Sequence, residues 1–322
     1  MKIAALAVAL IASLGAVSPS VAADAYPSRP IHIVVPFPPG GLNDTIVRIM
    51  QPYLQQKLGQ PIVIDNRQGA SGMIGTEQVA KAAPDGYTLL VVASSHTVAP
   101  ATNAHMAFDT EHDLAAVSLL VRDPLMFVAS AKAGAKTLAD FVALAKSKPG
   151  KLNYGTPGND SQSHFVTELF DQQAGISMVQ VAYRGGAPMV LSLISGETDF
   201  GVLSMQLSEP QIKAGKLIPL ASGGKQRTSQ FPDVPTLSEA GYPQVEALQW
   251  DGMLAPAKTP ANVIAKLNGV LREVLGSPDV QQKLAAQGTT AAPTSPEEFQ
   301  NLVSTEIKRW KEVAKAANIH PH

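Results

Sequence analysis

The hydrophobic positions of this chain follow two periods that alternate along its length. Short apolar runs such as Ile31–Val35 are typical of buried strands, and spacings of three or four residues, as at Ile46 and Met50, predict helices. The strands expected on this basis are Ile31–Val35, Ile62–Asp65, Leu89–Ala93, Ala116–Val121, Leu125–Ser130, Met178–Val181, Phe200–Leu203 and Ile218–Ala221. The expected helices are Asp44–Leu58, Met73–Lys81, Leu138–Lys146, Ser163–Ala174, Ala187–Ser195, Ala261–Leu275 and Pro296–Ala317. This alternation predicts an α/β fold with mainly parallel sheets.

Two places in the pattern look like crossings between domains. Arg122-Asp123-Pro124 separates two strand-like runs, and a second crossing precedes the strand-like segment Ala247–Leu254. A chain that leaves one domain and returns predicts a discontinuous lobe I, residues 24–122 and 248–322, and a continuous lobe II, residues 123–247. A cleft between two such lobes is a natural site for a ligand.

The N-terminus has the pattern of an export signal. Lys2 is followed by an uncharged run from Ile3 to Val17, and Val21-Ala22-Ala23 offers the small residues that a signal peptidase reads. We therefore expect a signal peptide over residues 1–23, cleaved near Ala23, and a mature protein in the periplasm. A membrane anchor is the alternative, but the apolar run is short for a span.

Composition excludes several other classes of protein. The 322 residues include no cysteine, so disulfides, thiolate metal sites and a lipid on Cys are all excluded. A formal net charge of −1 gives no electrostatic reason to expect a nucleic-acid partner. We expect a monomer without metal or cofactor.

The segment from Val35 to Asp44 is the most informative stretch of the chain. It reads Val-Pro-Phe-Pro-Pro-Gly-Gly-Leu-Asn-Asp and joins an expected strand to an expected helix. Prolines stiffen such a loop, and the backbone N–H groups from Gly40 onward have no helical partner of their own. The loop can therefore hold an anion with main-chain dipoles, or it can be a tight connection and nothing more.

A second strand–loop–helix unit, Leu152–His164, resembles the first. Ser161 and Ser163 are candidate N-caps, whereas the hydroxyls of Thr156 and Ser161 can alternatively turn towards a ligand. Ser161 and His164 also raise the possibility of a serine hydrolase. No G-x-S-x-G elbow surrounds Ser161, and no acidic partner is evident, so this alternative is weak.

Other polar residues give weaker signals. The glycines of Asn66–Gly75 do not have dinucleotide-binding spacing, and the histidines near residue 100 lack metal-ligand spacing. We expect His96 in a loop that lines a cleft. Arg184 can clamp a carboxylate or remain solvated, and Asp199 can hold a loop or accept a ligand atom.

These segments, taken in order, resemble the Bug/TctC family of periplasmic solute receptors of tripartite tricarboxylate transporters. The matching stretches are Val35–Gly41 with Asp44, Asp65–Gly75, Ala83–Leu89, Tyr154–His164, Tyr183-Arg184-Gly185 with Pro188, Gly215-Lys216-Leu217 and Phe231–Thr236. The resemblance implies a two-lobed type II periplasmic-binding-protein fold that closes on a small organic carboxylate. It also implies that the receptor delivers its ligand to membrane permease subunits and is not an enzyme.

The resemblance further implies which residues contact the ligand. The first loop would contribute Phe37, Gly41, Leu42 and Asn43, and the second Thr156, Gly158, Ser161 and His164. Weaker candidates are Ser94, His96, Arg184, Asp199 and Ser204.

The chain departs from the family at Thr156 and Asp160, where serine and glycine are usual. If Asp160 faces the cleft, its charge opposes a carboxylate nearby and favours an amine or neutral group. Dicarboxylates, aromatic acids and amino acids all remain open as ligands. A ligand sensor that signals to a regulatory partner is the alternative use of the same fold.

Overall fold

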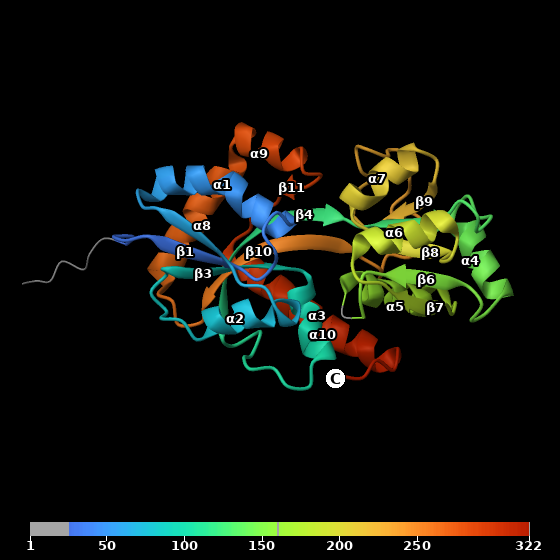
Figure 1. Ribbon diagram of the computed structural model, residues 1–322, viewed down its shortest axis with the longest axis horizontal. Coiled ribbons are helices and arrows are strands. Elements are labelled where there is room, and N and C mark those ends of the chain that lie inside the picture. The colour runs from blue at the N-terminus through green and yellow to red at the C-terminus, as the bar shows by residue number, and fades with distance from the viewer. Residues whose placement is uncertain (1–25, 160, 322) are drawn as a thin grey trace, which may run out of the picture.

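The computed structural model describes residues 26–159 and 161–321 of the chain. It consists of two α/β lobes that lie side by side and are joined by long crossing strands (Figure 1). The signal peptide predicted over residues 1–23, and the role considered for Asp160, lie outside the described residues.

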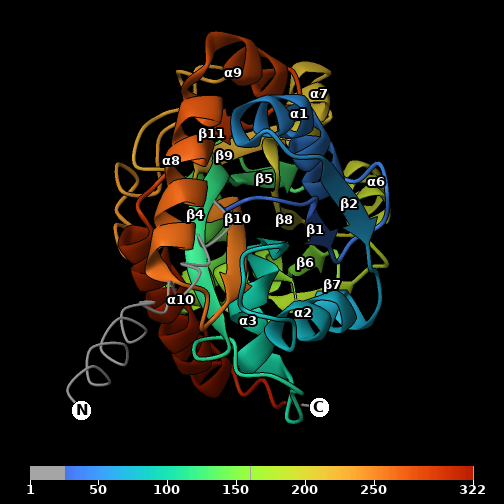
Figure 2. The same cartoon turned by 90° about the vertical axis from the view of Figure 1, so that its left-hand side faces the viewer.

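Lobe I is built on a six-stranded sheet in the order β11-β4-β10-β3-β1-β2. Its strands are β1 (Ile31–Val35), β2 (Ile62–Asn66), β3 (Thr88–Ala93), β4 (Leu114–Pro124), β10 (Leu248–Pro256) and β11 (Thr290–Ala291). The helices α1 (Leu42–Leu58), α8 (Ala261–Gly276) and α9 (Pro278–Ala285) cover one face. The other face carries α2 (Met73–Ala80), which follows the short 3₁₀ helix Ala70–Gly72, and also α3 (Ser95–Thr102) and α10 (Pro296–Ala316) (Figure 2).

Lobe II is built on a five-stranded sheet in the order β7-β6-β8-β5-β9. Its strands are β5 (Met126–Ser130), β6 (Asn153–Thr156), β7 (Val179–Ala182), β8 (Phe200–Leu203) and β9 (Leu217–Ser222). Its helices are α4 (Leu138–Ser147), α5 (Gln162–Ala174), α6 (Gly186–Ser195) and α7 (Met205–Lys213). The chain passes from one sheet to the other between β4 and β5, and returns to the first in β10. The residue boundaries given above for the lobes remain predictions.

The α/β two-lobed fold is the expected one, but the expectation of mainly parallel sheets needs correction. Both sheets are mixed, and five of the nine strand pairings are antiparallel. The antiparallel pairings all involve β4, β5 or β10, the strands that carry the chain between the lobes. Helix–strand alternation predicts the parallel units, but it does not reveal the direction of a strand that returns from another lobe.

All the strands and helices predicted from the sequence are present, while the sequence missed α3, α7, α9 and β11. Helices α3 and α7 each contain a proline, Pro100 and Pro210, and α9 begins with one. Proline weakens the sequence signal of a helix because it removes a hydrogen-bond donor and clashes with the preceding turn. The prediction that His96 lies in a loop is wrong, because this residue lies in α3.

Helix α10 packs into the cores of both lobes. Its N-terminus has a capping box between Ser295 and Glu298. Phe299 and Ile307 belong to the apolar cluster beneath the lobe I sheet, whereas Trp310 is buried in the main cluster of lobe II. The apolar face of this helix thus packs in both cores and connects the two lobes.

Among the described residues, no helix combines the length and apolar character that crossing a membrane requires.

Candidate functional site between the lobes

The β1–α1 loop ends in a helix whose N-terminus carries no side-chain cap. Gly41 is the N-cap residue, with extended backbone at φ −70° and ψ 168°, and Gly40 before it has a φ of 78° that favours glycine. The backbone N–H groups of Leu42, Asn43 and Asp44 find no hydrogen-bond acceptor among the described residues. Three donors at the positive end of the helix dipole are therefore available to an anion.

Asp44 holds this loop in place. Its carboxylate accepts hydrogen bonds from the backbone N–H of Gly40 at 2.8 Å, from Nε of Arg48 at 2.8 Å and from Nδ2 of Asn66 at 3.0 Å. Although burial favours the neutral acid, these hydrogen bonds and the Arg48 charge hold the pKa of Asp44 below its usual range. Arg48 thus balances the one carboxylate in the first turn of α1.

A second carboxyl group, Asp251 on β10, lies against the same helix turn. Nδ2 of Asn43 donates a hydrogen bond to Oδ1 of Asp251, which is 2% exposed. Burial and the nearby charge of Asp123 raise the pKa of Asp251 to about 8, and burial raises that of Asp123 to about 6. Sequence reasoning missed Asp251, although a lone carboxyl between Trp250 and Gly252 in an apolar strand was a usable signal.

Ser94 forms a direct link between the lobes. Its Oγ donates to Oε1 of Gln162, the first residue of α5, at 2.6 Å, and Nε2 of Gln162 donates to the carbonyl of Leu248 at 2.7 Å. The backbone N–H of Ser94 donates to the carbonyl of Trp250 at 2.9 Å. The end of β3 in lobe I, the start of α5 in lobe II and β10 are therefore held together, and Gln162 is a second residue that sequence reasoning missed.

His96 lies just behind the β1–α1 loop. It lines a small cavity of about 20 Å³ together with Pro36 and Phe37, a space that suits a single water molecule. Burial lowers the pKa of His96 to about 4, so the ring is neutral at physiological pH. Its Nε2 is buried and has no hydrogen-bond partner among the described residues.

The hydroxyl groups of the β6–α5 loop form hydrogen bonds with other groups of lobe II. Thr156 is fully buried, and its Oγ1 accepts a hydrogen bond from Nε2 of Gln180 at 2.9 Å. Ser161 is the N-cap of α5: its Oγ donates to the carbonyl of Gly158 at 2.7 Å and accepts from the backbone N–H of His164 at 3.3 Å. These hydroxyls therefore have structural partners in the same loop or sheet.

The geometry around Ser161 is not that of a hydrolase. Nδ1 of the His164 ring contacts the carbonyl of Asn159, and Nε2 lies 3.9 Å from Oε1 of Glu168. Among the described residues, the hydroxyl of Ser161 forms hydrogen bonds with main-chain groups and with no imidazole nitrogen. A nucleophile needs a base within hydrogen-bonding reach, and neither ring nitrogen of His164 is bonded to this hydroxyl.

Three of the weaker candidates, Arg184, Asp199 and Ser204, lie at the two ends of the strands of the lobe II sheet. Arg184 is exposed and follows β7, and Ser204 is the N-cap of α7 after β8. Because β6, β7 and β8 are parallel, both residues lie at the same C-terminal end of the strands as the β6–α5 loop. Asp199 precedes β8 at the opposite end, where its Oδ2 accepts from the backbone N–H of Asn153 at 2.8 Å. The structure brings Arg184 and Ser204 to the same end as the loop, but not Asp199.

The remaining first-loop candidates are partly buried. Phe37 and Leu42 pack against the lobe I core, and the carbonyl of Phe37 accepts a hydrogen bond from Asn66. Both therefore shape the wall of the loop with apolar surface.

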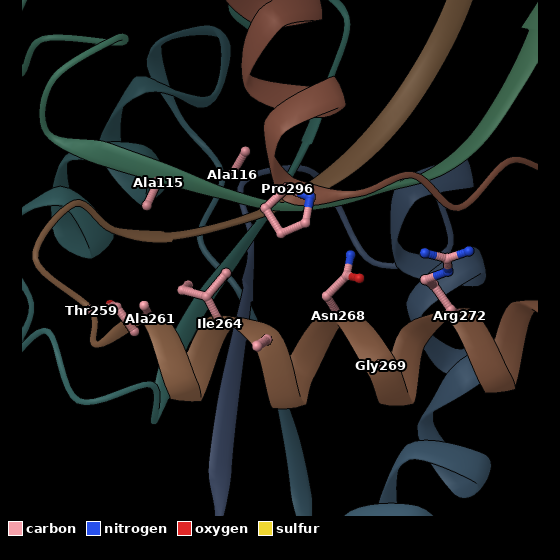
Figure 3. Close-up of a pocket in the computed structure, with 10 residues that line it drawn as sticks. Ala115, Ala116, Thr259, Ala261, Ile264, Asn268, Gly269, Arg272 and Pro296 are labelled. Atoms are coloured by element: carbon pink, nitrogen blue, oxygen red, sulfur yellow. The ribbon is translucent and has the colours of Figure 1, made fainter.

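Two further cavities are present, one close to the loops between the lobes and one away from them. One of about 560 Å³ is lined from both lobes, by Asp123 and Leu248 on the crossing strands, Met205 of α7 and Thr290 of β11. The other, of about 730 Å³, is an apolar hollow along α8 that includes Ile264 and Asn268 (Figure 3). None of the residues predicted to contact a ligand lines either cavity, although Met205 and Asp123 place the cavity of about 560 Å³ close to Ser204 and Asp251.

A fold of two mixed α/β lobes, with helix N-termini at the strand ends between them, defines a two-lobed solute-binding protein. The profile of the tripartite tricarboxylate transporter family receptor, TctC, matches residues 46–319. The chain belongs to this family.

Individual relatives agree with this assignment. The chain is similar to protein BugT of Bordetella pertussis, at 37% identity over 95% of this chain and 94% of that one. Among solved structures it resembles an R. palustris protein with adipate, at 33% identity and a TM-score of 0.78, over 92% of this chain and 100% of that one. It also resembles MatC from Rhodopseudomonas palustris with bound malate, at 32% identity and a TM-score of 0.74, over 89% and 99% of the two chains. The family consists of periplasmic solute-binding receptors and not of enzymes.

Proposed function

We propose that this protein binds a small organic carboxylate between its lobes and delivers it to the membrane subunits of a tripartite tricarboxylate transporter. In this proposal the carboxylate of the ligand lies at the N-terminus of α1. The observation that carries it is the set of three backbone N–H groups, at Leu42, Asn43 and Asp44, that have no acceptor among the described residues.

Two further features support a carboxylate at this place. The helix dipole adds positive potential at these donors, and Arg48 already balances the charge of Asp44. Adipate and malate, named with two of the similar structures, are both carboxylic acids. The link from Ser94 through Gln162 to Leu248 would couple the start of α5 in lobe II to the end of β3 and to β10, the strand that carries Asp251.

A thermal-shift screen with mono-, di- and tricarboxylates and amino acids tests the proposal. A ligand that binds only the folded state, present at about 100 times its Kd, raises the unfolding free energy by about 2.7 kcal/mol. We expect at least one carboxylate to raise the melting temperature by several degrees, and uncharged amides of the same acids not to do so. The protein is unfolded, dialysed and refolded first, so that a retained ligand cannot mask the effect. No shift with any carboxylate would contradict the proposal.

Delivery needs a separate experiment. Vesicles that contain the transporter membrane subunits should accumulate the radiolabelled carboxylate only when this protein is added. Uptake that does not depend on the added protein would contradict the delivery step and leave ligand binding intact.

A further inference from the structure

Asn43 and Asp251 form a polar pair at the floor of the proposed site. Asn43 is the second residue of α1 and is half-buried, and its Nδ2 donates to Oδ1 of the buried Asp251 on β10. No other described residue forms a hydrogen bond with the side chain of Asn43. The partner on β10 is therefore what orients this amide.

The hydrogen bond from Nδ2 to Asp251 determines which polar atom of Asn43 is left without a partner among the described residues. A carboxyl group keeps an acceptor oxygen whether it is ionised or protonated, so Asp251 can hold Nδ2 in either state. The two polar atoms of a side-chain amide diverge from Cγ, so an Nδ2 bonded to Asp251 leaves Oδ1 pointing in another direction, without a partner among the described residues. Because Asn43 lies between Leu42 and Asp44 in the first turn of α1, this Oδ1 is an unused acceptor in the same turn as their free N–H groups.

We propose that the Asn43–Asp251 pair selects carboxylates that carry a hydrogen-bond donor, a hydroxyl or an amine, on the carbon next to the carboxylate. The inference rests on the proposed function, because it assumes that the carboxylate lies at the N-terminus of α1. The donor of such a ligand then bonds to Oδ1 of Asn43, which makes Asn43 a specificity-determining contact. Asp251 is a positioning residue that acts through it.

An unsubstituted acid satisfies this arrangement less well. Once the lobes enclose it, the Oδ1 acceptor of Asn43 has lost water and gained no partner. Leaving a desolvated polar group unpaired weakens binding more than the missing contact alone would. Asp251 lies next to Asp123 and is largely protonated at neutral pH, so the floor of the site adds little charge that would repel the bound carboxylate.

Isothermal titration calorimetry with matched ligand pairs tests the inference. The pairs are malate and aspartate against succinate, and 2-hydroxyadipate against adipate, which differ only in the donor. We expect the donor-bearing member of at least one pair to bind about tenfold more tightly than its plain partner. The selectivity ratio is the useful readout, because a merely structural defect weakens both members alike.

Two variants test whether the Asn43–Asp251 pair is responsible for this selectivity ratio. Asp251→Asn supplies an amide that can donate to Oδ1 of Asn43 and release its orientation, and Asn43→Ala removes the acceptor. Both should lower the ratio to about threefold or less, whereas the control Asp233→Asn, at an exposed position, should not change it.

The outcomes separate this inference from the function on which it rests. Carboxylate binding with a ratio near one in the unaltered protein, or a ratio that survives Asn43→Ala, overturns the inference alone. If neither these acids nor any other carboxylate of the thermal-shift panel binds, the proposed function fails and the inference fails with it. Asn43→Ala lies on a partly exposed first turn, so it keeps the test decisive even if Asp251→Asn does not fold.

Discussion

The two loops that the sequence presents as counterparts differ in how they use their helix N-termini. In lobe I, the N-cap of α1 is Gly41, which has no side chain to offer, and three N–H groups stay free among the described residues. In lobe II, the N-cap of α5 is Ser161, whose hydroxyl accepts from the backbone N–H of His164. All three first-turn N–H groups of α1 are thus free, whereas at α5 the N–H of His164 is taken by the Ser161 hydroxyl and only those of Gln162 and Ser163 lack an acceptor among the described residues.

This contrast shows that stability and binding compete for the same donors. Relative to glycine, a side-chain cap stabilises a helix by a few tenths of a kcal/mol, and α1 forgoes that gain. The lobe I loop regains order elsewhere, through the bonds that Asp44 makes to Gly40, Arg48 and Asn66. We therefore assign the ligand carboxylate to lobe I and give the β6–α5 loop a supporting role in shape and closure.

Introducing a side-chain cap at the N-terminus of α1 should have the largest effect on binding, because it makes this helix end resemble that of α5. Gly41→Asp places a carboxylate that accepts from the first-turn N–H groups and repels an anionic ligand. We expect carboxylate affinity to fall by about 100-fold or more, while the unfolding free energy rises by a few tenths of a kcal/mol. Calorimetric titration and urea denaturation measure the two effects.

Gly41→Ala is the matched control, because it adds the same Cβ, 3.3 Å from the carbonyl of Pro38, without a cap. Equal affinity losses in the alanine and aspartate variants would mean that the added Cβ, and not the capping carboxylate, is responsible.

Raising the pH should weaken binding at the lobe I loop. The pKa of Asp251 is about 8 in the folded protein, so the group ionises as the pH passes through this value. A charge there, beside the ionised Asp123, should lower carboxylate affinity by about tenfold between about pH 7 and 9. Asp251→Asn should remove this dependence, and an unaltered pH profile in that variant would contradict the assignment to Asp251.

The same group should make stability depend on pH with a definite sign. Asp251 binds its proton more tightly in the folded protein than at its ordinary pKa of 3.8. The unfolding free energy should therefore fall as the pH rises from about 4 to about 8, by on the order of 5 kcal/mol, since each unit of pKa difference corresponds to about 1.4 kcal/mol. Urea denaturation of Asp251→Asn should give a flatter profile over this range, and an equally steep one would mean that other groups are responsible.

Removing the Ser161 cap of α5 should lower stability and leave carboxylate affinity almost unchanged, the reverse of the result expected for α1. Ser161→Ala should lower the unfolding free energy by about 1 kcal/mol and change carboxylate affinity by less than about threefold. Ser163→Ala is the control, because Ser163 lies two residues after Ser161 and is not the N-cap; this variant should leave stability nearly unchanged. A tenfold loss of affinity in Ser161→Ala, with the melting temperature preserved, would instead make this hydroxyl a direct ligand contact.

Arg184 should give the smallest effect. It is exposed and has no ion-pair partner among the described residues. A solvated charge of this kind contributes little, so Arg184→Ala should change dicarboxylate affinity by about twofold or less at physiological ionic strength. A larger loss for dicarboxylates than for monocarboxylates would show that Arg184 holds the distal end of the ligand.

The sequence predicted the fold class, the long helices and the β1–α1 loop, because these depend on local periodicity and on Pro-Gly turn chemistry. It did not predict Asp251 or Gln162, since their partners, Asn43 and Ser94, are distant in sequence and come close only when the lobes assemble. It also presented the two loops as equivalent. Whether a serine caps its own helix or faces a ligand is decided by its rotamer, which no sequence pattern reveals.

An amide proton–nitrogen NMR titration with malate tests the central claim most directly. We predict that the largest chemical-shift changes fall on the backbone amides of Leu42, Asn43 and Asp44, with smaller ones on Gln162 and His164 as the lobes close. Saturating changes centred on Gln162–His164, with the Leu42–Asp44 amides unmoved, would contradict the claim that the open end of α1 holds the carboxylate.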